Sequence, residues 1–213
     1  AIDKLTEARE LEPNDPIIHF ALAELLYFDG QYLRATREYE VVLDTGEYEI
    51  NGINLFSRMA DCALQSGNYS DAIQLFDEIS EDEMISDDFF KKAIAYEKND
   101  LTQEAIKIMT TLLSKDPDFI QGYFYLQSLY ENEKNYPDAI ETGKEGLRLN
   151  QFYKELMVST GSLEIEHGDA NEGVELLKKA LEVDNGYHKP LLILSDLFRQ
   201  KEDYEAIISL LSY

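Results

Sequence analysis

A helical pattern that returns about every 34 residues is the feature that most constrains how this chain of 213 residues can fold. A turn followed by an amphipathic helix occurs in DGQYLRATREYEVV, SGNYSDAIQLFDEI, NDLTQEAIKIMTTL and KNYPDAIETGKEG. Aligning the middle of this helix gives steps of 34, 37, 33, 34, 34 and 34 residues between Ala1, Ala35, Ala72, Ala105, Ala139, Gly173 and Ile207. This spacing indicates one supersecondary unit that is repeated along the chain.

Each unit has the same internal order of helix, turn and helix. Apolar residues at helical spacing indicate first helices over 17–28, 53–64 and 119–130. Glycine or a polar residue follows, as in Gly30 and Gly67, where a helix C-terminus needs a positive φ. No strand is expected, and the stretch 44–52 is interpreted as a longer loop that explains the step of 37. One helix pair cannot bury its apolar face alone, so we expect stacked pairs with a continuous core.

These residues resemble the tetratricopeptide repeat, a helix-turn-helix unit of 34 residues. With the small residue of the second helix placed at position 20, the unit from residue 16 supplies the family's favoured residue types at Leu22, Ala23, Gly30, Ala35 and Tyr39. The unit from residue 53 supplies them at Phe56, Met59, Ala60, Gly67, Ala72 and Phe76. The resemblance covers the whole chain. It implies an all-α fold, a right-handed α-α superhelix of about 13 helices.

The resemblance also predicts the organisation of the chain. We expect one array over residues 1–213, with a partial unit at 1–15 and further units that begin at residues 16, 53, 86, 120, 154 and 188. Natural arrays end in polar capping helices, and neither end here has one, so a segment of a longer chain is expected. The chain is also similar to the YpiA-like group of long repeat proteins from low-GC Gram-positive bacteria.

Some positions depart from the family pattern. Lys92 stands at an apolar position and Glu164 at an aromatic one. Four helix-contact positions in the fourth and fifth units carry glycine, which weakens a helix by about 0.5 to 1 kcal/mol relative to Ala. They are Gly143, Gly146, Gly161 and Gly173. We therefore predict that the junction between these two units is the softest part of the chain.

The charge limits the classes of partner. With 43 acidic and 19 basic residues, the net charge is −24. Nucleic-acid binding draws on dense Lys and Arg, so no nucleic-acid partner is expected. No stretch approaches the roughly 18 to 20 apolar residues of a membrane span, so no membrane insertion is expected. The single cysteine, Cys62, excludes an internal disulfide and favours a reducing, cytoplasmic location.

Residues for catalysis are sparse. The three histidines, His19, His167 and His188, fall in separate units without metal-ligand spacing. No phosphate-binding, dinucleotide-binding or nucleophile motif occurs, so we expect no enzyme activity, no cofactor and no metal. Cys62 lies among apolar neighbours and is interpreted as a buried structural thiol. The acidic run 78–88 lacks the pattern of a calcium loop and is interpreted as a solvated loop.

The expected binding surface is the groove lined by the first helices, which form the concave side in this family. The positions opposite the packed stripe of each first helix predict its lining, although each aromatic ring could instead fill the space between neighbouring helices. The candidate ligand-binding residues are Phe20, Glu24, Tyr27, Phe28, Arg58, Asp61, Asp87, Phe90, Lys91, Phe124 and Tyr125. The Lys and Asn positions of a carboxylate clamp are unmatched, so no such clamp is expected.

The predicted function is a non-catalytic protein–protein interaction scaffold. It would bind a peptide or helix through apolar anchors, with Glu and Asp selecting basic flanks. A second hypothesis is the recognition arm of a larger enzyme or regulator whose active domain lies elsewhere. A third is a structural rod that self-associates. Fold alone does not choose among these hypotheses.

Overall fold

The computed structural model describes residues 1–184 and 186–210, which form thirteen α-helices and one short β-hairpin. The helices divide into two compact units, residues 1–108 and residues 109–213, and the boundary falls inside α7. Unit 1 holds α1 (Ile2–Leu11), α2 (Pro16–Phe28), α3 (Tyr32–Leu43), β1 (Glu49–Ile50), β2 (Ile53–Asn54), α4 (Leu55–Gln65), α5 (Tyr69–Asp77), α6 (Ser86–Lys98) and the start of α7 (Thr102–Lys115).

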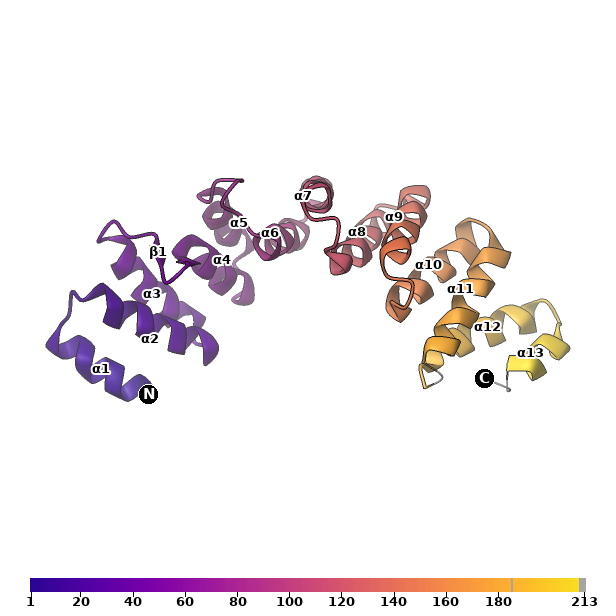
Figure 1. Ribbon diagram of the computed structural model, residues 1–213, viewed down its shortest axis with the longest axis horizontal. Coiled ribbons are helices and arrows are strands. Elements are labelled where there is room, and N and C mark those ends of the chain that lie inside the picture. Colours follow the sequence, from indigo (N-terminus) through magenta and orange to yellow (C-terminus); the bar gives the residue numbers. More distant parts are fainter. Residues whose placement is uncertain (185, 211–213) are drawn as a thin grey trace. The chain divides into compact units, whose positions relative to one another are not determined.

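Unit 2 holds the rest of α7 and the last six helices. These are α8 (Ile120–Asn132), α9 (Tyr136–Leu149), α10 (Lys154–His167), α11 (Ala170–Val183), α12 (His188–Gln200) and α13 (Tyr204–Leu210). From α1 to α6 and from α8 to α13, each helix packs against the next one along the chain (Figure 1). The prediction of an all-α fold with about 13 helices is confirmed for the part of the chain that the structure describes.

Capping side chains mark the beginning of two first helices, α2 and α4. The Asp15 carboxylate accepts hydrogen bonds from the backbone N–H groups of Ile17 and Ile18 at the start of α2, where Pro16 occupies the first turn. The side-chain oxygen of Asn54 caps α4 in the same way. These caps satisfy backbone donors that have no partner inside the helix.

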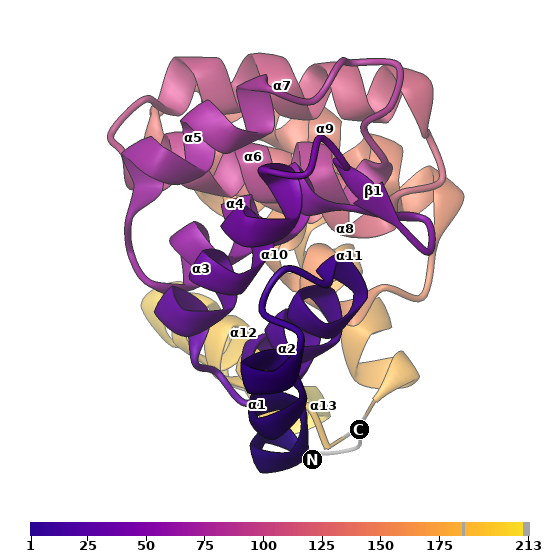
Figure 2. The same ribbon diagram turned by 90° about the vertical axis from the view of Figure 1, so that its left-hand side faces the viewer.

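The stretch 44–52 contains more than the loop expected from the sequence. Glu49 pairs with Asn54, and Ile50 pairs with Ile53, in an antiparallel hairpin that leads directly into α4 (Figure 2). Its two turn residues, Asn51 and Gly52, have φ values of 54° and 76°. Asn-Gly favours such a tight hairpin turn, so the expectation that no strand forms was wrong and the signal was present in the sequence.

Most turns inside the units end the first helix with a left-handed residue. Gly30 and Gly67 have positive φ as expected, and Asp100, Lys134 and Glu202 adopt the same conformation without being glycine. In each case the next N–H bonds back to a carbonyl five residues earlier, as in a Schellman motif. The expectation fails in the turn at Gly168, where φ is −137°.

The core of each unit is built from alternating large and small apolar residues. In unit 1, the ring of Tyr39 and the side chains of Leu22 and Leu26 are fully buried, and Ala23 and Ala35 let the helices approach. In unit 2, the side chains that have this role are Met157, Val158, Leu177, Ala180, Leu181 and Leu194. Fully burying one such large apolar side chain stabilises the fold by about 1.5 to 3 kcal/mol.

Candidate functional site

A row of polar side chains connects three first helices in unit 1. The guanidinium of Arg58 on α4 donates from Nε to Glu24 Oε1 on α2 at 3.0 Å and from Nη2 to Glu24 Oε2 at 3.3 Å. Tyr39 on α3 donates its hydroxyl proton to the same Glu24 carboxylate at 2.5 Å. The Arg58 guanidinium also lies 4.8 Å from the centre of the Tyr27 ring, within the range of a cation–π contact. Glu24 is therefore held by charge and by hydrogen bonds.

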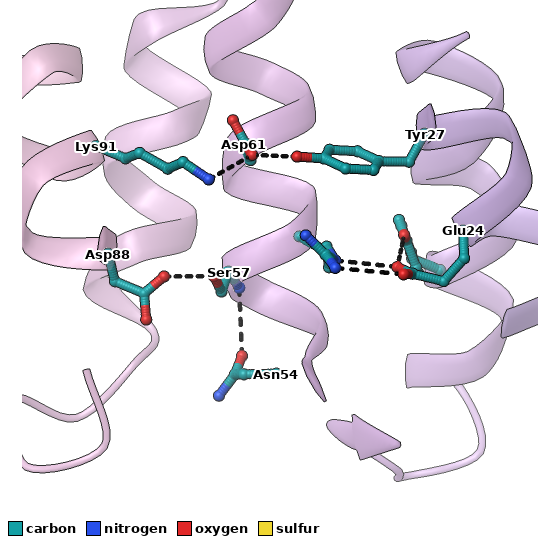
Figure 3. Close-up of polar contacts among 9 residues, drawn as sticks. Glu24, Tyr27, Asn54, Ser57, Asp61, Asp88 and Lys91 are labelled. Atoms are coloured by element: carbon teal, nitrogen blue, oxygen red, sulfur yellow. Dashed lines mark hydrogen bonds and ion pairs between the residues drawn. The ribbon is translucent and has the colours of Figure 1, made fainter. Parts of the chain in front are cut away.

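The row continues from α4 to α6 through a buried carboxylate. Asp61 is 2% exposed, and its Oδ2 accepts hydrogen bonds from the Tyr27 hydroxyl at 2.5 Å and from Lys91 Nζ at 2.6 Å. Lys91 also pairs with Asp87 at 2.9 Å. We call the six residues Glu24, Tyr27, Arg58, Asp61, Asp87 and Lys91 the polar ladder, and the side of unit 1 on which they lie the first-helix face. Figure 3 shows the connection from Tyr27 through Asp61 to Lys91.

The environment of the ladder shifts the pKa values of its members. Burial, reinforced by the hydrogen bond to Asp61, raises the pKa of the Tyr27 hydroxyl to about 12. Burial alone would raise the pKa of the Asp61 carboxyl, but the hydrogen bonds from Lys91 and Tyr27 outweigh it and hold that pKa below its usual value. Burial alone would lower the pKa of Lys91, but its hydrogen bonds to the carboxylates of Asp61 and Asp87 raise it. Asp61 and Lys91 are therefore both charged at neutral pH, and the Tyr27 hydroxyl keeps its proton.

A second polar contact fixes the beginning of α6 against α4. Ser57 on α4 donates its hydroxyl proton to the Asp88 carboxylate (Figure 3). Asp88 also accepts the backbone N–H of Ile85 at 3.3 Å. Asn54, at the end of the hairpin, accepts the N–H of Ser57 at 3.3 Å. These contacts place the hairpin, the start of α4 and the start of α6 around one hollow.

Two pockets adjoin on this face, and Asp87 and Lys91 line both of them. The first, of about 280 Å³, is lined by five acidic and two basic side chains. They are Glu49, Asp61, Glu83, Asp87, Asp88, Arg58 and Lys91. The second, of about 330 Å³, has apolar and aromatic walls formed by Leu64, Tyr69, Phe90 and Ile94. The polar side chains of Gln65, Asp87, Lys91 and Lys98 also line it. An acidic hollow thus lies beside an apolar one.

The structure brings most of the candidate residues together but not all of them. The six ladder residues form one network, Phe90 lines the apolar pocket, and the ring of Phe28 is 74% exposed beside Tyr27. Phe20 requires a correction, because it is only 7% exposed and its ring packs 6.4 Å from that of Tyr39, so it offers no free surface. Its position in the first helix faces the next helix of its own pair.

The remaining two candidates belong to unit 2. Phe124 and Tyr125 on α8 are both partly buried, and the ring of Phe124 lies 6.0 Å from that of Tyr153. This contact matches the alternative that an aromatic residue fills space between elements. A binding role for this pair stays a prediction.

The site also contains residues outside the candidate set. Glu49 reaches it from the hairpin, Glu83 from the loop before α6, and Tyr69 from the start of α5. The Asn-Gly turn could have indicated Glu49, because a hairpin that leads into α4 must lie beside the first turn of that helix. No local pattern marks Glu83 or Tyr69, since their positions depend on how neighbouring pairs stack.

Membrane-spanning helices and metal-binding clusters were sought among the described residues. No helix among them is long and apolar enough to cross a membrane. No group of three or more His, Cys, Asp or Glu side chains in the described part of the chain could hold a metal ion.

Comparisons with known proteins agree with this arrangement. Residues 1–47 match the family described as YpiA-like, tetratricopeptide repeats, and residues 89–118 match the tetratricopeptide repeat family. Both segments are thus tetratricopeptide repeats. The chain is 31% identical over 208 residues to the TPR repeat-containing protein YpiA of Bacillus subtilis (strain 168). That match covers 98% of this chain and 49% of YpiA, so the chain spans about half the length of that relative.

Solved structures of other tetratricopeptide-repeat proteins share the fold. The crystal structure of YrrB, described as a TPR protein with an unusual peptide-binding site, superimposes with a TM-score of 0.68 at 16% identity and covers 91% of this chain and 98% of its own. MamA gives a TM-score of 0.70 at 19% identity, with 82% of this chain and 94% of its own covered. The C-terminal part of a TPR repeat-containing protein from Cytophaga hutchinsonii gives 0.74 at 18% identity, with 91% and 79% covered.

Proposed function

We propose that this chain is a non-catalytic scaffold that binds a short segment of another protein on the first-helix face of unit 1. The observation that carries the proposal is the pair of adjoining pockets that share Asp87 and Lys91. A segment that crosses these two residues would place a basic side chain in the acidic pocket and an apolar side chain in the apolar pocket. The fold of YrrB, described as having a peptide-binding site, supports binding of this kind.

The ladder sets the charge preference of the acidic pocket. Arg58 neutralises Glu24, and Lys91 is shared by Asp61 and Asp87, so these charges are largely satisfied within the protein. Glu49 and Glu83 are exposed at the rim, and neither takes part in an ion pair within the described residues. We therefore assign the selection of a basic side chain to Glu49 and Glu83, and the rigid shape of the surface to the ladder.

We propose no catalytic role because the polar groups of the ladder are already paired with one another. Every ladder carboxylate is already paired with a cation or a hydroxyl, and the raised pKa of Tyr27 keeps that hydroxyl protonated at neutral pH. Such groups hold a surface in place but have no free proton acceptor to offer a substrate. A cytoplasmic location fits the proposal, because the buried Cys62 needs no oxidising compartment.

Selection from a random peptide library tests the proposal. We expect wild-type protein to enrich peptides with Lys or Arg next to a large apolar residue. The variant Glu49→Gln/Glu83→Gln should lose the basic preference and keep the apolar one, because both side chains are exposed and the ladder stays intact. A matched control, Glu10→Gln/Glu145→Gln, removes two exposed charges away from both pockets. If wild type enriches nothing, or if both variants select the same peptides as wild type, the proposed site is wrong.

A further inference from the structure

Unit 1 has a second groove that uses a different set of α4 side chains. It lies between α3 and α5, has α4 as its floor, and encloses about 490 Å³. The floor carries Phe56, Met59 and Ala63, and Leu33 forms an apolar rim that is 66% exposed. We call it the α3–α5 groove. It shares no lining residue with the two pockets of the first-helix face.

The charged side chains of the α3–α5 groove all have the same sign. Glu40 on α3, Asp71 on α5 and Glu78 at the end of α5 line it, and no basic residue does. All three carboxylates are exposed, and within the described residues none of them forms an ion pair or a side-chain hydrogen bond. This differs from the first-helix face, where Arg58 and Lys91 compensate the buried acids. The groove therefore keeps an uncompensated negative rim around an apolar floor.

We propose that the α3–α5 groove binds a basic amphipathic helix of a partner protein. One or two large apolar side chains of that helix would lie on the partly buried Phe56 and the exposed Leu33. Lys or Arg side chains on both flanks would pair with Glu40 on one wall and with Asp71 and Glu78 on the other. The volume of about 490 Å³ accommodates a few side chains rather than a whole helix, which is how a helix lies on a groove.

The chemistry of the groove favours this occupant over two others. A second copy of this chain carries a net charge of −24, so it would be repelled by the acidic rim. A small polyamine would satisfy the carboxylates but leave the apolar floor and Leu33 in contact with water. Only a ligand that is both basic and apolar matches both features.

Binding of a designed peptide tests the proposal. The probe is a fluorescent helical peptide of about 14 residues with leucines at i, i+3 and i+4 and lysines on both sides. We expect the variant Glu40→Gln/Asp71→Asn/Glu78→Gln to weaken binding about tenfold or more at physiological salt, and the substitution Leu33→Ser to weaken it a few-fold. The control Glu10→Gln/Glu145→Gln/Glu182→Gln changes the net charge equally at three exposed positions outside the groove, and should bind like wild type.

Photocrosslinking separates this groove from the site of the proposed function. A crosslinker attached at Gln74→Cys, on the wall of the α3–α5 groove, should capture the peptide, whereas one at Lys98→Cys, in the apolar pocket of the first-helix face, should not. Selective labelling is feasible because the natural Cys62 is 1% exposed and burial raises the pKa of its thiol to about 11. Capture only from Lys98→Cys would overturn this inference and leave the proposed function standing.

Further binding and competition measurements also test whether the α3–α5 groove binds the peptide. Absence of binding to wild type, or equal binding by the groove variant and the control, would show that the groove is not a docking surface. Equal competition by spermine and by the unlabelled peptide would show that the rim binds small cations without using the apolar floor. A peptide with the same composition but scrambled order should bind more weakly, because it cannot present leucines on one face.

Discussion

The two units differ in the contacts that are most prominent between their helices. In unit 1, α2, α4 and α6 are connected by charged side chains that meet at the buried Asp61. In unit 2, α9, α10 and α11 approach so closely at glycines that no side chain fits between them. A Cβ atom added at Gly143 would lie 2.2 Å from the Thr160 hydroxyl, and one added at Gly173 would lie 2.5 Å from the carbonyl oxygen of Gly161.

This difference predicts different sensitivities. A network of ion pairs depends on protonation and on having every partner present, because a buried charge without its partner is costly. A backbone contact depends on volume and is indifferent to pH. Unit 1 should therefore respond most to charge removal and to pH, and unit 2 should respond most to added side-chain volume.

The largest expected effect is that of Gly173→Ala. Alanine favours the helix by about 1 kcal/mol, but its methyl group would press on the Gly161 carbonyl and on the backbone N of Ile165 at 2.9 Å, and neither atom can rotate away. Overpacking of this kind should give a net loss of about 3 kcal/mol in the free energy of unfolding, measured by circular dichroism in urea. The control is Gly46→Ala, whose methyl group has open space but whose φ of 89° costs about 1 kcal/mol. Equal losses would mean that close packing is not what requires glycine at residue 173.

The next effect is that of Asp61→Ala in unit 1. It leaves the Tyr27 hydroxyl without its buried acceptor and Lys91 with only Asp87, and should cost about 2 kcal/mol. The matched control is Glu141→Ala, which breaks an ion pair with Arg148 whose side chains are 58% and 65% exposed, and should cost less than about 1 kcal/mol. Urea unfolding of both variants gives the comparison, and a small loss for Asp61→Ala would refute the central role of the ladder.

The pH dependence should be smaller, and the ladder should contribute to it at both ends of the pH range. Because the pKa of Asp61 is lowered in the folded state, Asp61 stabilises the fold above its unfolded pKa of about 3.9. This stabilisation is lost as the pH falls through the folded pKa. Because the pKa of Lys91 is raised, its contribution is present below about 10.4 and is lost as the pH rises through the folded pKa. Asp61→Asn should flatten the acidic side of a stability–pH curve, and a curve of unchanged slope would contradict the assignment.

The smallest effect concerns local opening. Glycines at four helix contacts should let amides in 141–173 exchange a few-fold faster than those in 55–76, since each glycine costs about 0.5 to 1 kcal/mol in a helix. Hydrogen exchange followed by mass spectrometry measures this difference. Equal protection would show that close packing at Gly161 and Gly173 offsets the cost of the glycines.

One departure from the family pattern acquires a physical reason only in the folded chain. Glu164 is 2% exposed, pairs with Lys144 at 2.5 Å and accepts the backbone N–H of Asp169 at 2.6 Å. A Cβ atom added at Gly168 would lie 2.0 Å from the Glu164 carboxylate, so this glycine makes room for a buried acid rather than for a left-handed turn. The sequence pattern marks Glu164 as a departure but does not connect it with Gly168.

The sequence by itself determined the helices, their order and most of the ladder. Helical periodicity and a spacing of about 34 residues depend on local geometry, and they place Glu24, Arg58, Asp61 and Lys91 on first helices without knowledge of any contact. Tertiary structure alone decided which of these side chains meet. The burial of Phe20, the reach of Glu49 from the hairpin and the uncompensated acids of the α3–α5 groove all depend on how neighbouring pairs stack. That stacking is fixed by side-chain packing between residues about 30 positions apart, which a local pattern does not encode.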